Sequence, residues 1–320
     1  MADFLAPVYN WAVKWSRIGV IASLLIVLLF KILNLNMSLN IQLVLALVAL
    51  LVGIPHGAID HLISIPRDPT SRFITFIAIY VFIAVIAGVL ISTWNVNGFR
   101  AVLLMSSLHF GFGDASFSNE RRDSLKAKRL NSLSEILYAI PAGFLPVLLP
   151  LTDSRTTDAL ERIHPGLTNW AGGFGKEMRA GLIYISIFSL LFFMISKNFS
   201  QVIDLLLLAG LSVFAPPLVA FASYFGFWHA LRHTARLVPK LEKARNLASI
   251  NEWKRAILGA ITPGLYAVVG TLFISGLLMF VKPENFSSSL LWSTLLVVWA
   301  LTVPHMIVTA RFDLKALKVK

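Results

Sequence analysis

The chain contains no cysteine among its 320 residues. That absence excludes disulfides, thiolate-ligated haem, iron–sulfur clusters and cysteine-bound zinc, which leaves histidine and carboxylate side chains as the strong metal ligands. Charged residues are scarce as well: they make up 14% of the sequence, whereas 57% of the residues are hydrophobic. This composition is typical of a polytopic membrane protein rather than a soluble globule.

Several common functional signatures are also missing. The sequence has no Walker loop, no dinucleotide-binding fingerprint and no nucleophile elbow. The formal net charge is +12, but the basic residues lie between apolar runs, where membrane topology places them, so nucleic acid is not an expected partner. The first fifteen residues lack the order of a cleavable signal peptide, so we expect the first apolar run to remain as a signal anchor in a multi-pass protein of the inner cell membrane.

The apolar runs predict an all-α fold, a single integral membrane domain over residues 1–320 with about ten transmembrane helices at about 20 residues per crossing. The division near Pro216 and Pro217 is the least certain, because proline breaks a run too long for one helix. With the N-terminus and the C-terminus in the cytoplasm, most basic residues fall in cytoplasmic segments, which supports this orientation. The predicted spans are 16–36, 39–64, 72–93, 99–118, 131–150, 180–197, 199–215, 217–238, 256–281 and 287–311.

Six of the seven histidines lie in these apolar runs, where ionisable groups are costly and indicate function. In the ten-helix topology they all belong to the second, fourth, eighth and tenth spans, which run in the same direction. His56, His109, His229 and His305 then lie at one depth, roughly 9–14 Å from the cytoplasmic boundary at about 1.5 Å per residue. Such a layer of imidazoles predicts a metal site inside the membrane. His164 lies outside it, in the polar 151–179 segment, and is expected to be an ordinary surface residue.

His229 and His233 are spaced i,i+4 in the motif HALRH, so both can reach one metal ion from one helix face. Ala230 stands where zinc peptidases of similar spacing carry their general-base glutamate, which argues against peptide hydrolysis. The plainer interpretation is a pair of helix-end histidines at the cytoplasmic surface, assisted by Arg232 and Arg236.

Two further motifs pair a histidine with an aspartate. In GIPHGAIDH, Asp60 follows His56 by one helical turn, a separation that lets a carboxylate orient an imidazole ligand, whereas His61 points about 140° away. In LHFGFGDA, glycines clear space around His109, and Asp114 follows. Asp60 and His61 could instead simply meet lipid headgroups, and close helix packing alone would explain the glycines.

His305 follows Pro304 in an otherwise apolar run. An isolated imidazole is more often a hydrogen-bonded core residue than a ligand, so His305, like His61, is left open as an additional ligand or a supporting residue. Aromatic residues near the histidines could line an apolar channel, although phenylalanine is common in membrane helices. The candidates for such a lining are Phe110, Phe112, Tyr224 and Trp228.

The motifs GIPHGAIDH, LHFGFGDA, FGFWHALRH and VPHM, in this order, resemble the Brp/Blh family of β-carotene 15,15′-dioxygenases, membrane enzymes that supply retinal to microbial rhodopsins. The resemblance runs from the second to the tenth span. It implies a non-haem Fe(II) centre and O2-dependent cleavage of the central double bond of β-carotene into two all-trans-retinal molecules. By motif, it implies that His56, His109, His229 and His233 are the iron ligands and catalytic residues. From the residues themselves we expect Asp60 and Asp114 to orient such ligands rather than to transfer protons.

Three other functions stay open at this point. A membrane desaturase or hydroxylase also uses histidine-bound iron, but its two irons need about eight histidines in HxxxH and HxxHH boxes, and this chain has one HxxxH and no HxxHH. A proton-coupled or metal transporter would need acidic residues deep in several spans. A non-enzymatic carotenoid-binding or rhodopsin assembly factor would hold no catalytic metal. Neutral imidazoles and an intramembrane site for a hydrocarbon substrate favour the dioxygenase.

Overall fold

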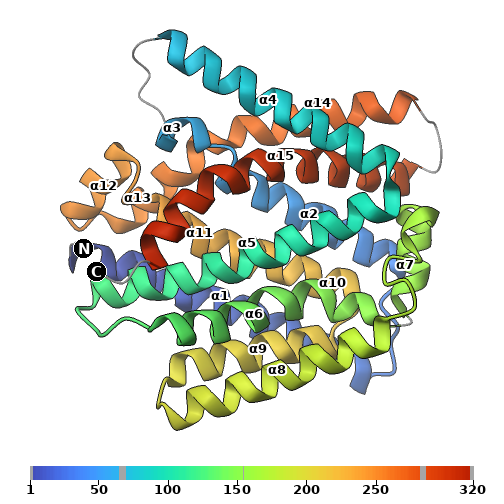
Figure 1. Cartoon of the computed structure of the whole chain (residues 1–320), viewed down its shortest axis with the longest axis horizontal. Helices are drawn as coiled ribbons and strands as arrows, with labels where there is room; N and C mark the ends of the chain where they lie inside the picture. The colour runs from blue at the N-terminus through green and yellow to red at the C-terminus, as the bar shows by residue number, and fades with distance from the viewer. Residues whose placement is uncertain (1–2, 65–69, 154, 282–285, 318–320) are drawn as a thin grey trace.

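The computed structural model describes residues 3–64, 70–153, 155–281 and 286–317, which fold into helices and contain no strand. Figure 1 shows the helices running side by side along the longest axis of the molecule. The predicted all-α class is confirmed. The elements are η1 Asp3–Leu5, α1 Ala6–Ile32, α2 Leu39–Gly57, α3 Asp60–Ser64, α4 Thr70–Thr93, α5 Asn95–Ser124, α6 Ser132–Leu148, η2 Pro150–Thr152, α7 Arg155–Ile163, η3 Pro165–Leu167, α8 Gly175–Ile195, α9 Phe199–Phe214, α10 Pro217–Ala222, η4 Ser223–His229, α11 Ala230–Leu237, α12 Glu242–Ser249, α13 Trp253–Ile261, η5 Thr262–Gly264, α14 Leu265–Val281 and α15 Phe286–Leu317.

Six stretches of helix in the described part of the chain are long and apolar enough to cross a membrane, and they make this a multi-pass membrane protein. Large apolar side chains on α4, α8 and α14 point outward, including Phe82, Ile195 and Val269. An apolar outer surface of this kind suits lipid rather than water. The six stretches are 3–32, 39–64, 70–93, 175–195, 253–279 and 290–317, and α6 and α9 are shorter apolar helices.

Each of the ten predicted apolar runs coincides with helix, but several boundaries differ. The break at Pro216 is confirmed, because α9 ends at Phe214 and α10 begins at Pro217, where a proline suits the first helical turn. The first span begins ten residues earlier than predicted, at Ala6, since Val8, Tyr9 and other residues of the first turns are buried against the core.

The bundle packs most closely where α5 crosses α6. A Cβ atom on Gly111 would lie 2.0 Å from the carbonyl oxygen of Ala139, and one on Gly143 would lie 2.0 Å from that of Ser107. Only glycine fits at both positions, because the two backbones touch directly. This contact fixes α5, and with it His109, against the rest of the bundle.

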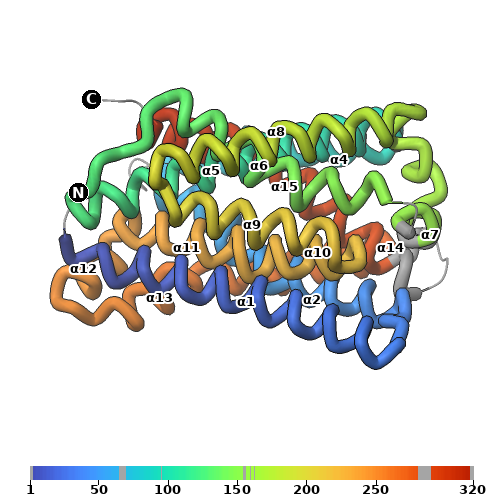
Figure 2. The backbone as a smooth tube through the Cα atoms, turned by 90° about the horizontal axis from the view of Figure 1, so that it is seen from below, coloured from blue at the N-terminus to red at the C-terminus, as the bar shows by residue number. Residues whose placement is uncertain are grey.

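The start of α1 and the C-terminal end of α15 lie at one end of the bundle, and α7 lies at the opposite end (Figure 2). The described ends of the chain therefore lie at the same end of the bundle in Figure 2. The segment from η2 to η3 covers the far end, packing on α5, α10 and α15. The site described next lies between these two ends.

Candidate metal centre

Five buried histidines from α2, α5, η4, α11 and α15 meet inside the bundle. They are His56, His109, His229, His233 and His305. Ring centroids of contacting pairs are separated by 4.9 Å for His56 and His229 and by up to 6.2 Å for His109 and His233. The single layer expected from the sequence is thus a compact cluster, which we call the histidine cluster.

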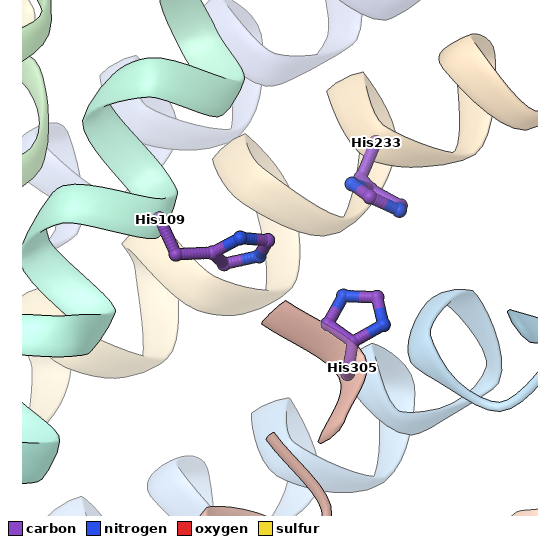
Figure 3. Close-up of side chains that lie close together, drawn as sticks. All are labelled: His109, His233 and His305. Atoms are coloured by element: carbon purple, nitrogen blue, oxygen red, sulfur yellow. The ribbon is translucent and has the colours of Figure 1, made fainter. Parts of the chain in front are cut away.

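Three of these rings form the tightest set. One nitrogen atom from each of His109, His233 and His305 lies within 4.8 Å of the others, close enough to hold one metal ion. Figure 3 shows the three rings pointing toward a common point from three different helices. Two of the four predicted ligands belong to this set. His305, left open by the sequence, takes the third place, while His56 and His229 pack beside it.

Several ring nitrogens of the histidine cluster have no hydrogen-bond partner. Nδ1 of His56 and the Nε2 atoms of His229, His233 and His305 are buried and have no hydrogen-bond partner within the described residues. Leaving such an atom unpaired costs about 1–3 kcal/mol, and a bound cation removes the cost by accepting the lone pair. His233 and His305 belong also to the converging set, and imidazole nitrogens of this kind are donors that suit Fe, Zn or Cu.

Asp60 orients a different histidine from the one predicted. Its carboxylate accepts a hydrogen bond from Nδ1 of His305, at 2.9 Å to Oδ2 and 3.1 Å to Oδ1, and another from the Tyr80 hydroxyl at 2.9 Å. The proton on Nδ1 leaves the Nε2 lone pair of His305 facing the cluster. The expectation that Asp60 orients His56 was wrong because the helix does not continue between them.

The interruption has a local cause. Helix α2 ends at Gly57 and α3 begins at Asp60, so the one-turn spacing that links positions i and i+4 is lost. Close to this break, Gly264 of η5 approaches so tightly that a Cβ atom on it would lie 2.1 Å from the carbonyl oxygen of Pro55. The chain can then turn Asp60 toward α15, where His305 lies.

His109 has a second support that the sequence did not indicate. The hydroxyl of Thr309 donates to the carbonyl oxygen of His305 at 3.0 Å and lies 3.4 Å from Nδ1 of His109. In that arrangement the hydroxyl oxygen accepts the Nδ1 proton and leaves Nε2 of His109 for a metal. Thr309 follows His305 by one helical turn, and this spacing could have identified it in the sequence as a supporting residue of the site. Nothing in the sequence indicates that Tyr80 supports Asp60.

The segment that carries His229 is a π-helix, η4. It continues a row of stacked rings, since Phe221 and Phe225 lie 5.7 Å apart at 12°, and Phe225 and His229 lie 6.1 Å apart at 24°. Helix α11 follows directly and places His233 with its ring 5.7 Å from that of His229. Single π turns are frequent at functional sites, and here one presents the HALRH pair to the cluster.

Within the part of the chain that the structure describes, Asp114 forms a hydrogen bond and an ion pair with residues other than histidine, contrary to expectation. Its carboxylate accepts a hydrogen bond from Nε1 of Trp228 at 2.6 Å and lies 3.7 Å from Arg232. Arg232 also reaches Asp204 at 3.0 Å and lies 3.7 Å from the centroid of the Trp228 ring. Together with Tyr138, which donates to Asp204 at 2.9 Å, these buried groups fix the position of α11 in the bundle.

The arginines of HALRHTAR are buried rather than at a headgroup surface. Arg232 is 2% exposed and Arg236 is 3% exposed. Arg236 pairs with Glu120 at 2.9 Å and with Asp313 at 2.7 Å. Buried charges are tolerated only when paired in this way. The interpretation of the motif as a helix end among headgroups is therefore wrong, and both arginines tie α11 to neighbouring helices.

An apolar cavity of about 360 Å³ opens onto the histidine cluster. His56, His109, His229 and His305 are part of its wall, which is otherwise mostly aliphatic and aromatic. Of the predicted lining residues, Phe110 faces the cavity. Tyr224 and Trp228 lie in the core behind it, and Phe112 packs against that core. Phe225 is also part of the wall, as are Phe99 and Phe221, which the sequence did not single out.

The remaining histidines lie in other surroundings. His61, on the short α3, borders the cavity and packs against Phe73, with ring centroids 6.0 Å apart. His164 is half-buried rather than an ordinary surface residue. Its Nδ1 accepts a hydrogen bond from the amide of Gly166, and its ring lies 4.4 Å from that of Trp292.

The fold and the site define a multi-pass helical membrane protein that buries five histidines beside an apolar cavity. The chain belongs to the β-carotene 15,15′-dioxygenase family, whose model matches residues 47–313. A relative from an uncultured marine bacterium, 66A03, bears the name β-carotene 15,15′-dioxygenase. It is 26% identical over 269 residues, which cover 81% of this chain and 89% of the relative. No solved structure matches the chain.

Proposed function

We propose that the protein is a non-haem iron dioxygenase that cleaves β-carotene at its central 15,15′ double bond. The reaction breaks that bond and gives each of its two carbon atoms one oxygen atom of O2, so that one β-carotene and one O2 yield two molecules of all-trans-retinal. The observation that carries the proposal is the histidine cluster at an apolar cavity, in a chain of this family.

The donor set fits Fe(II). His109, His233 and His305 would hold the ion, with His56 and His229 close enough to join or replace one of them. Bound iron would supply the activation of O2 that an organic side chain cannot. Asp60 keeps the Nδ1 proton on His305, which fixes the ring as a neutral ligand.

The cavity walls account for the choice of a hydrocarbon substrate. Phe110, Phe225 and Leu295 face the cavity, and each is at most 8% exposed. Such walls offer a polyene surroundings as apolar as the lipid it comes from, and they keep water away from the reacting bond. A substrate dissolved in the bilayer needs no transfer through water to reach them.

The surroundings of the reaction follow from the same proposal. The chain would cross the inner cell membrane about ten times, with both termini in the cytoplasm, and would take β-carotene from the lipid bilayer. Retinal would leave to an acceptor such as a microbial rhodopsin. An epitope tag added to the N-terminus or to the C-terminus would check this orientation, since a tag in the cytoplasm is inaccessible to antibody in intact cells.

The test of the proposed reaction is expression in cells that accumulate β-carotene. We expect loss of the orange colour and formation of retinal, with the His233→Ala variant as the inactive control at equal protein level. Intact β-carotene in the presence of folded, iron-loaded protein would refute the proposal. Two irons per chain would instead favour a desaturase or hydroxylase, and product formation separates an enzyme from a carotenoid-binding factor.

A further inference from the structure

One part of the cavity is lined mainly by buried residues of α2, α5, α10, η4 and α15, and we call it the closed arm. On α10 and η4 the wall residues Phe221 and Phe225 recur every four positions and lead to His229. On α15 the wall begins with Leu291 and leads to His305. Helices α2 and α5 contribute similar rows that end on His56 and His109. Four helix faces therefore form one apolar passage with the histidine cluster at its inner end.

The far end of the closed arm is covered by the segment between α6 and α8. Leu160 and Ile163 of α7 and Leu167 of η3 border the cavity there, and they are 5%, 8% and 1% exposed. Helix α7 packs against α15 and α10, and η3 packs against α5. The passage thus ends on a buried apolar cap, at the end of the bundle where Figure 2 shows α7.

The other part of the cavity, the open arm, leads sideways between α4 and α14. Its wall includes Tyr80 and Phe76 of α4 and Ala267 of α14, all half-buried, and Leu301 of α15, which is 37% exposed. These helices present apolar outer faces. A long apolar molecule in the cavity would have one half enclosed and the other half near the outer surface.

The length of the closed arm matches half of the substrate. Phe99 precedes His109 by ten residues and Leu291 precedes His305 by fourteen, which corresponds to about 15–21 Å of helix. In half a β-carotene, roughly nine bonds separate the central carbon from the ring, and at about 1.2 Å of advance per bond they span roughly 11 Å before the ring is added. A ring pressed against the cap would place the central bond beside the histidines.

We propose that the closed arm selects the bond that is cleaved, with Leu160, Ile163 and Leu167 acting as the stop for the inserted ring. The inference rests on the proposed function and adds the residues that determine its positional specificity. A polyene offers many double bonds of similar reactivity, so that the position of the molecule decides which one reacts. The depth of the passage supplies that position.

The test shortens the arm at its cap and compares a matched change in the open arm. In Leu160→Trp the larger side chain should push the substrate outward by about 2–3 Å, which is about one double bond at about 1.2 Å per bond. We expect a carbonyl product shorter than retinal and its longer complement. Leu301→Trp makes the same replacement in the open arm, where it should slow the reaction yet leave retinal as the product.

Product analysis in carotene-accumulating cells distinguishes the outcomes. Retinal as the sole product of Leu160→Trp, in whatever amount, would overturn the inference and leave the proposed function standing. If that variant does not accumulate, Leu160→Ala decides: a deeper stop should give a mixture of cleavage positions, and retinal alone would count against the inference. Absence of any cleavage by the unchanged protein would overturn both proposals.

Discussion

The hydrogen bond between Asp60 and His305 offers a sharp test of the metal centre. Asp60 is 3% exposed, and its carboxylate receives the Nδ1 proton of His305 and the Tyr80 hydroxyl. Asparagine has nearly the same shape as aspartate, but it offers a single oxygen atom as acceptor for these two donors. Loss of such a supporting carboxylate costs about 10–100-fold in metal affinity, or about 1.4–2.7 kcal/mol. We therefore expect Asp60→Asn to fold normally and to bind Fe(II) 10–100-fold more weakly.

The assay is Fe(II) titration of purified protein in detergent, with the fraction of folded protein measured in parallel. Asp114→Asn is the matched control: Asp114 is equally buried, but it bonds to Trp228 and Arg232 instead of a histidine. That change should lower stability and leave the affinity per folded molecule nearly unaltered. Equal losses of affinity in both variants would mean that the effect is structural.

A double-mutant cycle then isolates the proposed route through His305. If Asp60 acts on the metal only by holding this ring, Asp60→Asn should cause no further loss of Fe(II) affinity in a His305→Ala background. Additive losses would refute the reasoning, because they would show that Asp60 supports the metal by another path.

Three further outcomes follow from the packing and the cluster. Arg232→Met should lower stability by about 3–5 kcal/mol, because it leaves the buried Asp114 carboxylate without a cation, whereas Asp204 keeps its ion pair with Arg17. Thermal unfolding checks this, and Arg245→Met, at an exposed position, should have little effect. Gly143→Ala should cost about 1–3 kcal/mol or more by pushing α5 from α6, whereas Gly270→Ala, with nothing within 4 Å of the added methyl, should be neutral by the same measurement. Purified protein should contain about one iron per chain, and His233→Ala should lose it, since an incomplete set of ligands holds the ion poorly; metal analysis that finds full iron in this variant would contradict the cluster as the site.

The helices and the histidine cluster could be predicted from the sequence for a simple physical reason. An apolar run of sufficient length has few structures open to it in a membrane, so that each run became helix. For spans that cross the membrane in the same direction, the number of residues from the inner end of each span gives the depth of its histidine. His56, His109, His229 and His305 meet as the depth argument requires.

The partners of the buried charges could not be predicted in this way. Helical periodicity tells which residues share a face but not which helix that face meets. Arg232 pairs with Asp204 and Asp114, which lie far away in the sequence, and Asp60 pairs with His305 across the bundle because α2 stops short of it. Such pairs depend on helix order and on breaks in helices, and one sequence alone specifies neither.

The π-helix η4 has a consequence for how this segment tolerates change in length. An i→i+5 turn amounts to one residue inserted into an α-helix and taken up within that turn, so the aromatic wall before it and the histidine pair after it keep nearly the phase of an uninterrupted helix. Deleting one residue from 223–228 would therefore let the segment close into an ordinary helix with Phe221 and His233 still on their present sides. An insertion in a regular part of the same helix has no such turn to absorb it and would rotate Phe221 by about 100° relative to His233. The wall and the metal-facing pair would then face different spaces, although every side chain of both survived.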